Sequence, residues 1–289
     1  MNRRSSLLAL TLSAAIFGTI GLFRRWIPLP SGMLAMIRGL LGTAAMIVLL
    51  LLRRQKPAWG AVRQNLWKLL ISGAMIGFNW ILLFEAYRFT TVAVATLCYY
   101  MAPILVLLVS PLLLRERLTL RKGICVLAAL FGMVLVSGVI GGENAVSAKG
   151  ILLGLGAAAL YASVVLTNKT IRGVPAIEKT AVQLFAAGVV LIPYVLLAEE
   201  VSAEMFTGGV IALTLVLGLI HTGLAYAMYF GSMDALSAQT VALFSYIDPV
   251  VAVLLSALLL REPMGLLTGI GTVLVICAAA VSELPGKEK

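Results

Sequence analysis

A twenty-residue apolar segment that occurs twice limits the folds open to this chain. Residues 97–116 read LCYYMAPILVLLVSPLLLRE, and residues 243–262, 146 positions later, read LFSYIDPVVAVLLSALLLRE, with ten identities. Each copy is long enough to cross a bilayer as a helix and has a proline near its middle, Pro103 or Pro249. A proline inside a helix removes a backbone hydrogen bond and kinks the helix. Kinked membrane helices at matching places in two halves predict a site near the bilayer midplane.

The composition indicates an integral membrane protein. Of the 289 residues, 61% are hydrophobic and 12% are charged, whereas an ordinary soluble domain has about 25% charged residues. A spanning helix needs roughly 20 apolar residues, so the chain has room for about ten spans and for no soluble domain. We therefore expect an all-α membrane protein with ten transmembrane helices, at 6–23, 32–52, 66–87, 91–114, 122–140, 149–168, 177–197, 208–230, 237–260 and 264–282.

The positive charges predict an orientation. With the N-terminus in the cytoplasm, sixteen Lys and Arg residues fall on the inner side and five on the outer side. This is the asymmetry of the positive-inside rule, so the net charge of +10 does not indicate nucleic-acid binding. We expect a multi-pass protein of the plasma (inner) membrane with both termini in the cytoplasm.

The odd number of spans in each half predicts that the halves are inverted. Five spans in residues 1–145 place the second half, residues 146–289, upside down in the membrane. Arg115-Glu116 then ends its helix on the cytoplasmic side, and Arg261-Glu262 on the outer side. Inverted repeats are typical of secondary transporters, which expose one central site to each face in turn.

Three features together are typical of one family: two five-helix halves, a proline in the fourth and ninth spans, and an Arg-Glu pair after both of these spans. In these features the chain resembles the drug/metabolite transporter superfamily, in its EamA-type ten-helix branch. The resemblance covers essentially the whole chain. It implies a carrier whose central cavity is lined mainly by the first, third, fourth, sixth, eighth and ninth helices. It also implies a substrate such as an amino acid, a nucleobase or an amine, which is often exported. The resemblance does not fix which of these the substrate is.

Asp248 is the sharpest functional candidate. It lies about the middle of the ninth span beside Pro249, and its counterpart in the first repeat is the neutral Ala102. A carboxylate at the centre of a spanning helix costs roughly 2.5–3.5 kcal/mol on insertion scales, and such residues face an interior. Asp248 would be a proton-binding site or a counter-charge for a substrate amine. The alternative is a structural aspartate bonded to the carbonyl that Pro249 frees.

Three further polar residues are candidates for proton transfer or gating. Arg38 lies several residues into the second span, where its side chain could snorkel to the headgroups. The resemblance, in which this helix often has a basic residue early, implies structural pairing or binding of a substrate carboxylate as alternatives. His221, the only histidine, could relay a proton or be a silent hydrogen-bonded residue. Glu85 shares a helix face with Arg88 near the outer end of the third span, so we expect a local ion pair or an outer gate.

Aromatic residues predict the walls of a binding site. Trp80 has Tyr226 as its repeat counterpart, and Tyr100 has Tyr246. Such rings can stack on a substrate or hold a cation, and the alternative is plain packing or anchoring at the membrane interface. The candidate substrate-binding residues are Trp80, Tyr99, Tyr226, Tyr246 and Asp248, with Asn79 beside Trp80.

The sequence contains no Walker A motif, no His-Glu-x-x-His, no Gly-x-Ser-x-Gly and no Cys/His metal cluster. We therefore expect a chain that is not an enzyme and needs no cofactor or metal. The resemblance implies a secondary transporter that exports a small polar metabolite such as an amino acid or an amine. The expected partners are that molecule, the lipid bilayer and a proton or another cation, in a monomer or weak dimer. The alternatives are an uncoupled uniporter, a lipid-linked flippase and, from another class, a membrane enzyme or sensor.

Overall fold

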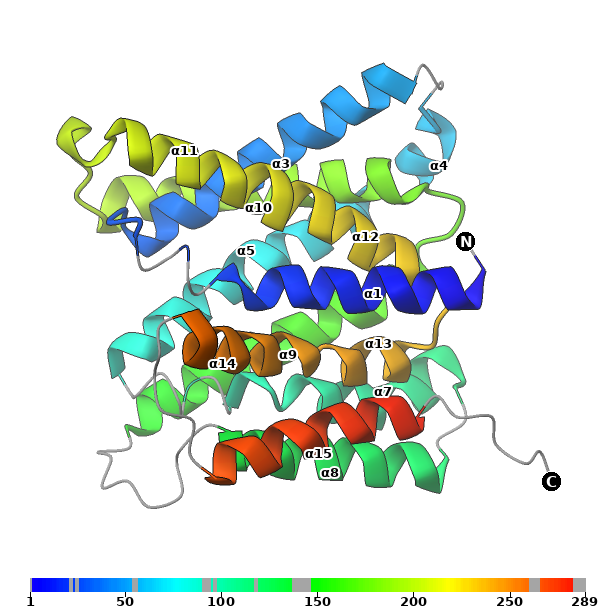
Figure 1. Ribbon diagram of the computed structural model, residues 1–289. Helices are drawn as coiled ribbons and strands as arrows, with labels where there is room; N and C mark the ends of the chain where they lie inside the picture. Colours follow the sequence, from blue (N-terminus) through cyan, green and yellow to red (C-terminus); the bar gives the residue numbers. More distant parts are fainter. Residues whose placement is uncertain are drawn as a thin grey trace.

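Helices that run side by side make up this protein (Figure 1). The computed structural model describes residues 2–20, 23, 26–53, 57–89, 95, 98–116, 119–136, 147–259 and 266–282. No strand occurs among those residues. The all-α fold class predicted from the sequence is therefore confirmed.

The helices follow the order expected from the two halves. The first half contains α1 (Arg3–Gly18), α3 (Ser31–Arg53), α4 (Trp59–Gln64), α5 (Leu66–Phe89), α7 (Ala102–Leu114) and α8 (Leu120–Val136). The second half contains α9 (Ala148–Thr170), α10 (Ala176–Ala198), the short 3-10 turn η1 (Ala203–Met205), α11 (Gly208–Val216), the π-helix η2 (Leu217–Leu224), α12 (Ala225–Ser232), α13 (Ala238–Phe244), α14 (Ile247–Leu259) and α15 (Leu266–Ser282). The short helix α4 lies within what we expected to be a connection at 53–65.

Five of the described helices are long and apolar enough to cross a membrane by themselves. They cover Ser31–Leu52, Leu66–Ala86, Ala148–Thr170, Ala176–Ala198 and Gly208–Ser232. Their bounds agree with the expected spans to within a few residues. The outward surface is apolar as well, with Leu112 85% exposed and Leu197 88% exposed, as contact with lipid requires. The other expected spans include residues outside the described ranges, or breaks in the helix, so the count of ten stays a prediction.

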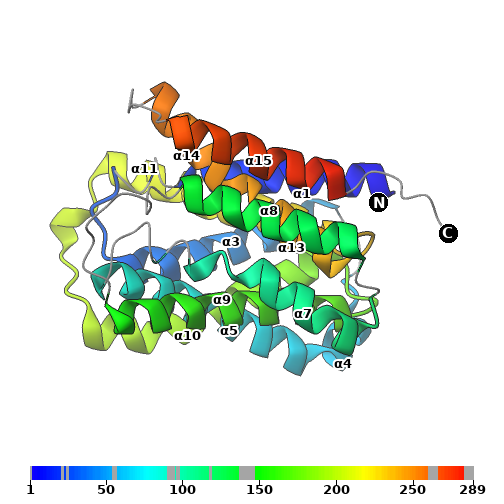
Figure 2. The same cartoon turned by 90° about the horizontal axis from the view of Figure 1, so that it is seen from below.

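The packing of the helices follows the internal repeat. Helix α5 packs on α9 and α10. The counterparts of α5 in the second half are α12 and η2, and they pack on α1 and α3, which are the counterparts of α9 and α10. Helix α7 packs on α9 as α14 packs on α1, while α3 packs on α10 and α8 on α15. Figure 2 shows the last pair side by side from a second direction. Exchanging the halves therefore maps this set of contacts onto itself, which is the pattern of two halves related by a two-fold axis.

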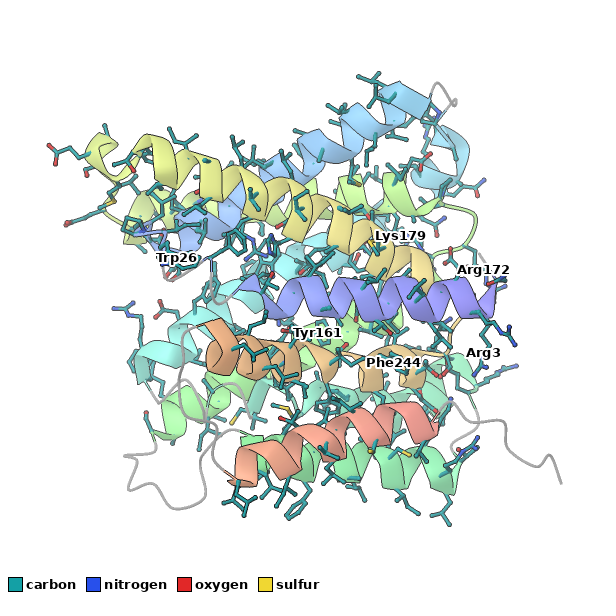
Figure 3. The ribbon with its side chains drawn as sticks, in the orientation of Figure 1. Arg3, Trp26, Tyr161, Arg172, Lys179 and Phe244 are labelled. Carbon is teal, nitrogen blue, oxygen red and sulfur yellow. The ribbon has the colours of Figure 1, made fainter. Side chains whose placement is uncertain are left out.

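The helices run between two opposite ends of the bundle. The first turn of α1 and the last turn of α15 lie at the same end (Figure 1). Arg3 and Arg172 lie at that end, and Trp26 lies at the opposite end (Figure 3). Both ends of the described chain are thus on one side, as an even number of crossings requires.

The prolines of the repeat begin helices rather than kink them. Helix α13 ends at Phe244, Ser245 and Tyr246 form a turn, and α14 places Pro249 in its first turn. Pro103 likewise lies in the first turn of α7. The expectation of a kink inside one continuous helix is corrected here, because a proline in a first turn removes an N–H that has no partner within the helix.

Glycines set the distance between the packed helices, and one pair of them supplies a test. A Cβ on Gly73 would meet the backbone of Gln183 and would lie 2.7 Å from the Cβ of Ala186, whereas Gly123 has nothing within 4 Å. Gly73→Ala should therefore lower the free energy of unfolding by about 1–3 kcal/mol through overpacking between α5 and α10.

Gly123→Ala, in a helix with open space around it, should be neutral or stabilising by up to about 1 kcal/mol. Thermal unfolding of both variants in detergent micelles checks this. Equal melting temperatures for the two would contradict the close contact of α5 with α10.

Candidate functional site

A carboxylate lies where the helix pair α13 and α14 is interrupted. Asp248 occupies the first turn of α14, where the N-terminal end of a helix favours a negative charge. The Tyr246 hydroxyl donates to the carbonyl oxygen of Tyr100 at 2.8 Å, so the two interrupted regions of the chain are joined to each other.

Aromatic rings from four helices, α1, α5, α9 and α12, surround this break. Phe17 of α1 lies 5.0 Å from Tyr226 of α12, and Trp80 of α5 lies 6.2 Å from the same ring, between centroids. The hydroxyl of Tyr161 from α9, in the middle of the bundle (Figure 3), bonds the hydroxyl of Tyr229 and lies 2.8 Å from Ser245 Oγ.

Two pairs of repeat counterparts contact each other in this cluster. Trp80 and Tyr226 are one pair, and Tyr100 and Tyr246, with centroids 5.7 Å apart, are the other. Tyr99 lies 5.6 Å from Tyr161 and completes the cluster. Residues that a two-fold operation exchanges can touch only near its axis. The cluster therefore lies at the axis between the halves, where the sequence predicted a site.

Arg38 of α3 is buried beside this cluster, with 6% of its surface exposed. Its Nε donates to Thr222 Oγ1 at 3.1 Å, and its guanidinium carbon lies 5.3 Å from the centroid of the Trp80 ring. The side chain therefore points into the bundle, so the snorkelling alternative does not describe it.

His221 lies in the π-helix η2 and contacts α1. Its Nε2 is 2.6 Å from Thr19 Oγ1, and its Nδ1 is 3.3 Å from the carbonyl oxygen of Val216. The ring also packs edge-on against Phe23, with centroids 4.7 Å apart. The wider π turn was not predicted, and it places His221 and Thr222 on the α1 and α3 sides of the same segment.

The other two candidates, Asn79 and Glu85, form hydrogen bonds outside this cluster. Asn79 donates to the carbonyl oxygen of Ala157 at 2.7 Å, which ties α5 to α9 and uses its amide nitrogen. Glu85 accepts from Arg88 at 3.0 Å and from the Tyr194 hydroxyl at 2.8 Å. The bond from Glu85 raises the pKa of the exposed Arg88. The local ion pair expected here is present, with Tyr194 as an additional partner.

A second polar cluster, at the end of the bundle that carries Arg3, holds the turn at residues 233–239. The carboxylate of Glu116 accepts from the backbone N–H of Ala238 at 2.9 Å, at the start of α13. Lys169 donates to the carbonyl oxygens of Met233 and Leu236, both at 2.6 Å. Two more lysines complete the cluster, with Lys122 Nζ 2.9 Å from Ser237 Oγ and Lys179 Nζ 3.2 Å from Asp234 Oδ1.

A cavity of about 470 Å³ lies beside this turn and is lined in part by Lys169, Arg172 and Asp234. The sequence assigned no such cluster, although the repeated Arg-Glu pair was a signal for it, since Glu116 holds the other half of the chain. Its counterpart Glu262 lies outside the described residues.

Several contributors were not predicted. Thr19 bonds His221, Thr222 bonds Arg38, and Ser245 bonds Tyr161 of the aromatic cluster. Nothing in the sequence distinguishes these three from other hydroxyl residues in apolar segments. Phe17 could have been found, because AAIFG around it lines up roughly with AALYA around Tyr161 in the second half. Within the described part of the chain, no group of three or more His, Cys, Asp or Glu residues could hold a metal ion.

Comparisons with known proteins agree with this architecture. The model of the EamA-like transporter family matches residues 4–138 and 148–283. The uncharacterized transporter YxxF of Bacillus subtilis (strain 168) is 27% identical over 97% of this chain and 90% of its own length. Protein PecM of Dickeya dadantii (strain 3937) is 29% identical over 82% and 78%. A solved crystal structure has the same fold, with a TM-score of 0.87 at 21% identity and 98% of each chain covered.

Proposed function

Since the chain belongs to the EamA-like transporter family, we propose that it is a secondary active transporter that exports a small polar metabolite such as an amino acid or an amine. The observation that supports this most is the contact of repeat counterparts, Trp80 with Tyr226 and Tyr100 with Tyr246, around the half-helix that carries Asp248. A site on the axis between two halves is the place that each half can expose in turn.

In this proposal Asp248 supplies the charge for the substrate or the proton, and Trp80, Tyr99, Tyr226 and Tyr246 form the walls. The interrupted helix α13–α14 and the start of α7 let the halves, 1–145 and 146–289, rock against each other about the site. Each opening would expose the site to one face.

The polar cluster around residues 233–239 would close one face when the other is open. We assign this end to the cytoplasm, because Lys and Arg side chains gather there as the positive-inside rule describes. Both termini would then be cytoplasmic, in the plasma (inner) membrane. His221, which bonds Thr19 across α1 and η2, is the candidate for proton coupling together with Asp248.

Counterflow into proteoliposomes tests the function. The panel consists of amino acids, amines and nucleobases, measured with and without a pH gradient and against protein-free liposomes. We expect exchange of one class, accelerated by the gradient. Exchange that ignores the gradient would contradict proton coupling and favour a uniporter. Absence of exchange for the whole panel would contradict the metabolite carrier, and turnover of a lipid would then favour the enzyme.

A further inference from the structure

Arg38 is a buried cation near the axis between the halves, and no carboxylate lies beside it in the described part of the chain. Ion pairs within 4.0 Å join Arg88 to Glu85 and Lys179 to Asp234 there, and none includes Arg38. Its neighbours are a neutral hydroxyl, that of Thr222, and one face of Trp80.

The hydrogen bonding of this guanidinium is incomplete. An arginine side chain has five N–H donors, and here the Nε–H has a partner while neither Nη group bonds any described residue. A buried charge without a counter-charge is strongly unfavourable, and in a membrane span it marks a functional position. The missing anion is therefore expected to come from a ligand.

The surroundings of Arg38 also fix its direction. The Thr222 hydroxyl donates to the carbonyl oxygen of Leu217 at 2.8 Å, which leaves its lone pairs for Arg38 Nε. The guanidinium carbon lies over the Trp80 ring, 5.3 Å from its centroid, and the Trp80 ring packs in turn against Tyr226. Held at Nε and on one face, the guanidinium keeps its Nη groups free for the two parallel bonds that a carboxylate accepts.

A second group, of opposite sign, borders the same aromatic cluster. A Cβ added to Gly18 of α1 would lie 2.5 Å from the carbonyl oxygen of Asp248, so α1 packs directly on the start of α14. The ring of Phe17, next to Gly18, lies 5.0 Å from that of Tyr226, and the Tyr226 ring lies 6.2 Å from Trp80, over which Arg38 sits. Arg38 and Asp248 form no ion pair with each other. Opposite charges held apart at one site match a ligand with both charges. A simple amine would satisfy Asp248 and leave Arg38 unpaired.

We propose that Arg38, Thr222 and Trp80 form a carboxylate subsite, so that the transported molecule carries a carboxylate together with an amine rather than an amine alone. This proposal rests on the proposed function and specifies its substrate class.

Trp80 supplies a direct test of binding that needs no transport. The chain has four tryptophans, and the other three, Trp26, Trp59 and Trp67, are 56%, 70% and 63% exposed. Replacing these three by Phe leaves Trp80, against Arg38, as the sole indole reporter. The probes are two matched sets: phenylalanine, phenethylamine and 3-phenylpropionate, and leucine, isopentylamine and 4-methylpentanoate.

We expect the amino acid of at least one set, and more weakly its acid, to change the Trp80 emission with saturation, whereas the amine does not. Arg38→Gln should weaken binding of the amino acid about 10- to 100-fold, the range for one charge-assisted bond. Arg38→Lys, which keeps the charge but loses the planar fork, should weaken it by less. Arg63→Gln, which removes an exposed arginine of α4, should leave binding unchanged.

Saturable binding of an amine as tight as that of its amino acid would overturn the carboxylate subsite. So would amino-acid binding that survives both Arg38 substitutions, or a Trp80 signal that no carboxylate-bearing probe changes. Amine counterflow alongside any of these results would leave the proposed function standing and contradict only the carboxylate subsite. Failure of counterflow for every class, with Trp80 still responding to amino acids, would contradict the proposed function and leave the carboxylate subsite standing.

Discussion

Asp248→Asn should reduce substrate-driven flux in proteoliposomes by about 100-fold or more. The substitution removes the only carboxylate seen at the central site among the described residues, at the N-terminal end of α14. A charged substrate group left there without its counter-charge loses about 3 kcal/mol, which is roughly 100-fold in a binding constant. The same substitution removes a proton-binding group, so a proton-driven cycle would stop as well.

The fold should survive this change, because Asn has the shape of Asp and Asp248 forms no ion pair with another described residue. The melting temperature should therefore stay close to that of the unchanged protein. Glu204→Gln, in the exposed turn η1, is the matched control and should transport normally. Full flux in Asp248→Asn would assign Asp248 a structural role.

The fold was predictable because two strong signals agree, namely apolar length and the repeat. The expected span 177–197 and the helix Ala176–Ala198 differ by one residue at each end. Local breaks within the helices were harder to predict. Pro249 indicates that a break is close but not that it comes at Ser245 and Tyr246, and nothing in Leu217–Leu224 signals a π turn. The short helix α4 is hidden because six residues are too few for a periodic pattern.

The site was predictable only where the repeat constrains it. Trp80 and Tyr226 are counterparts in sequence, and counterparts can meet at an axis. The rotation of each helix about its own axis could not be predicted, because these spans are apolar on all sides. The sequence therefore could not tell that Asn79 turns to the backbone of α9, or that Arg38 points inward instead of reaching the headgroups.

Asp234→Asn should destabilise the protein more than removal of the lysine with which Asp234 pairs. Lys179 has no exposed side-chain surface, whereas the Asp234 side chain is 61% exposed. Losing the carboxylate leaves a buried ammonium without its counter-charge, which costs about 3 kcal/mol, at the lower end of the usual range because water reaches Asp234. Lys179→Met leaves a solvated carboxylate and fills the same space with apolar atoms, so it should cost less than about 1 kcal/mol.

Thermal unfolding of both single variants and of Lys179→Met/Asp234→Asn measures this asymmetry. The double variant should be no less stable than Lys179→Met, since no buried charge then remains unpaired, and the two substitutions should be non-additive because the side chains are in contact. If Lys179→Met proves as damaging as Asp234→Asn, the turn at 233–239 is held by the lysine itself and not by the pair. If Asp234→Asn has no effect, the carboxylate contributes nothing to closing this end, and Glu116 and Lys169 hold the turn through their bonds to its backbone.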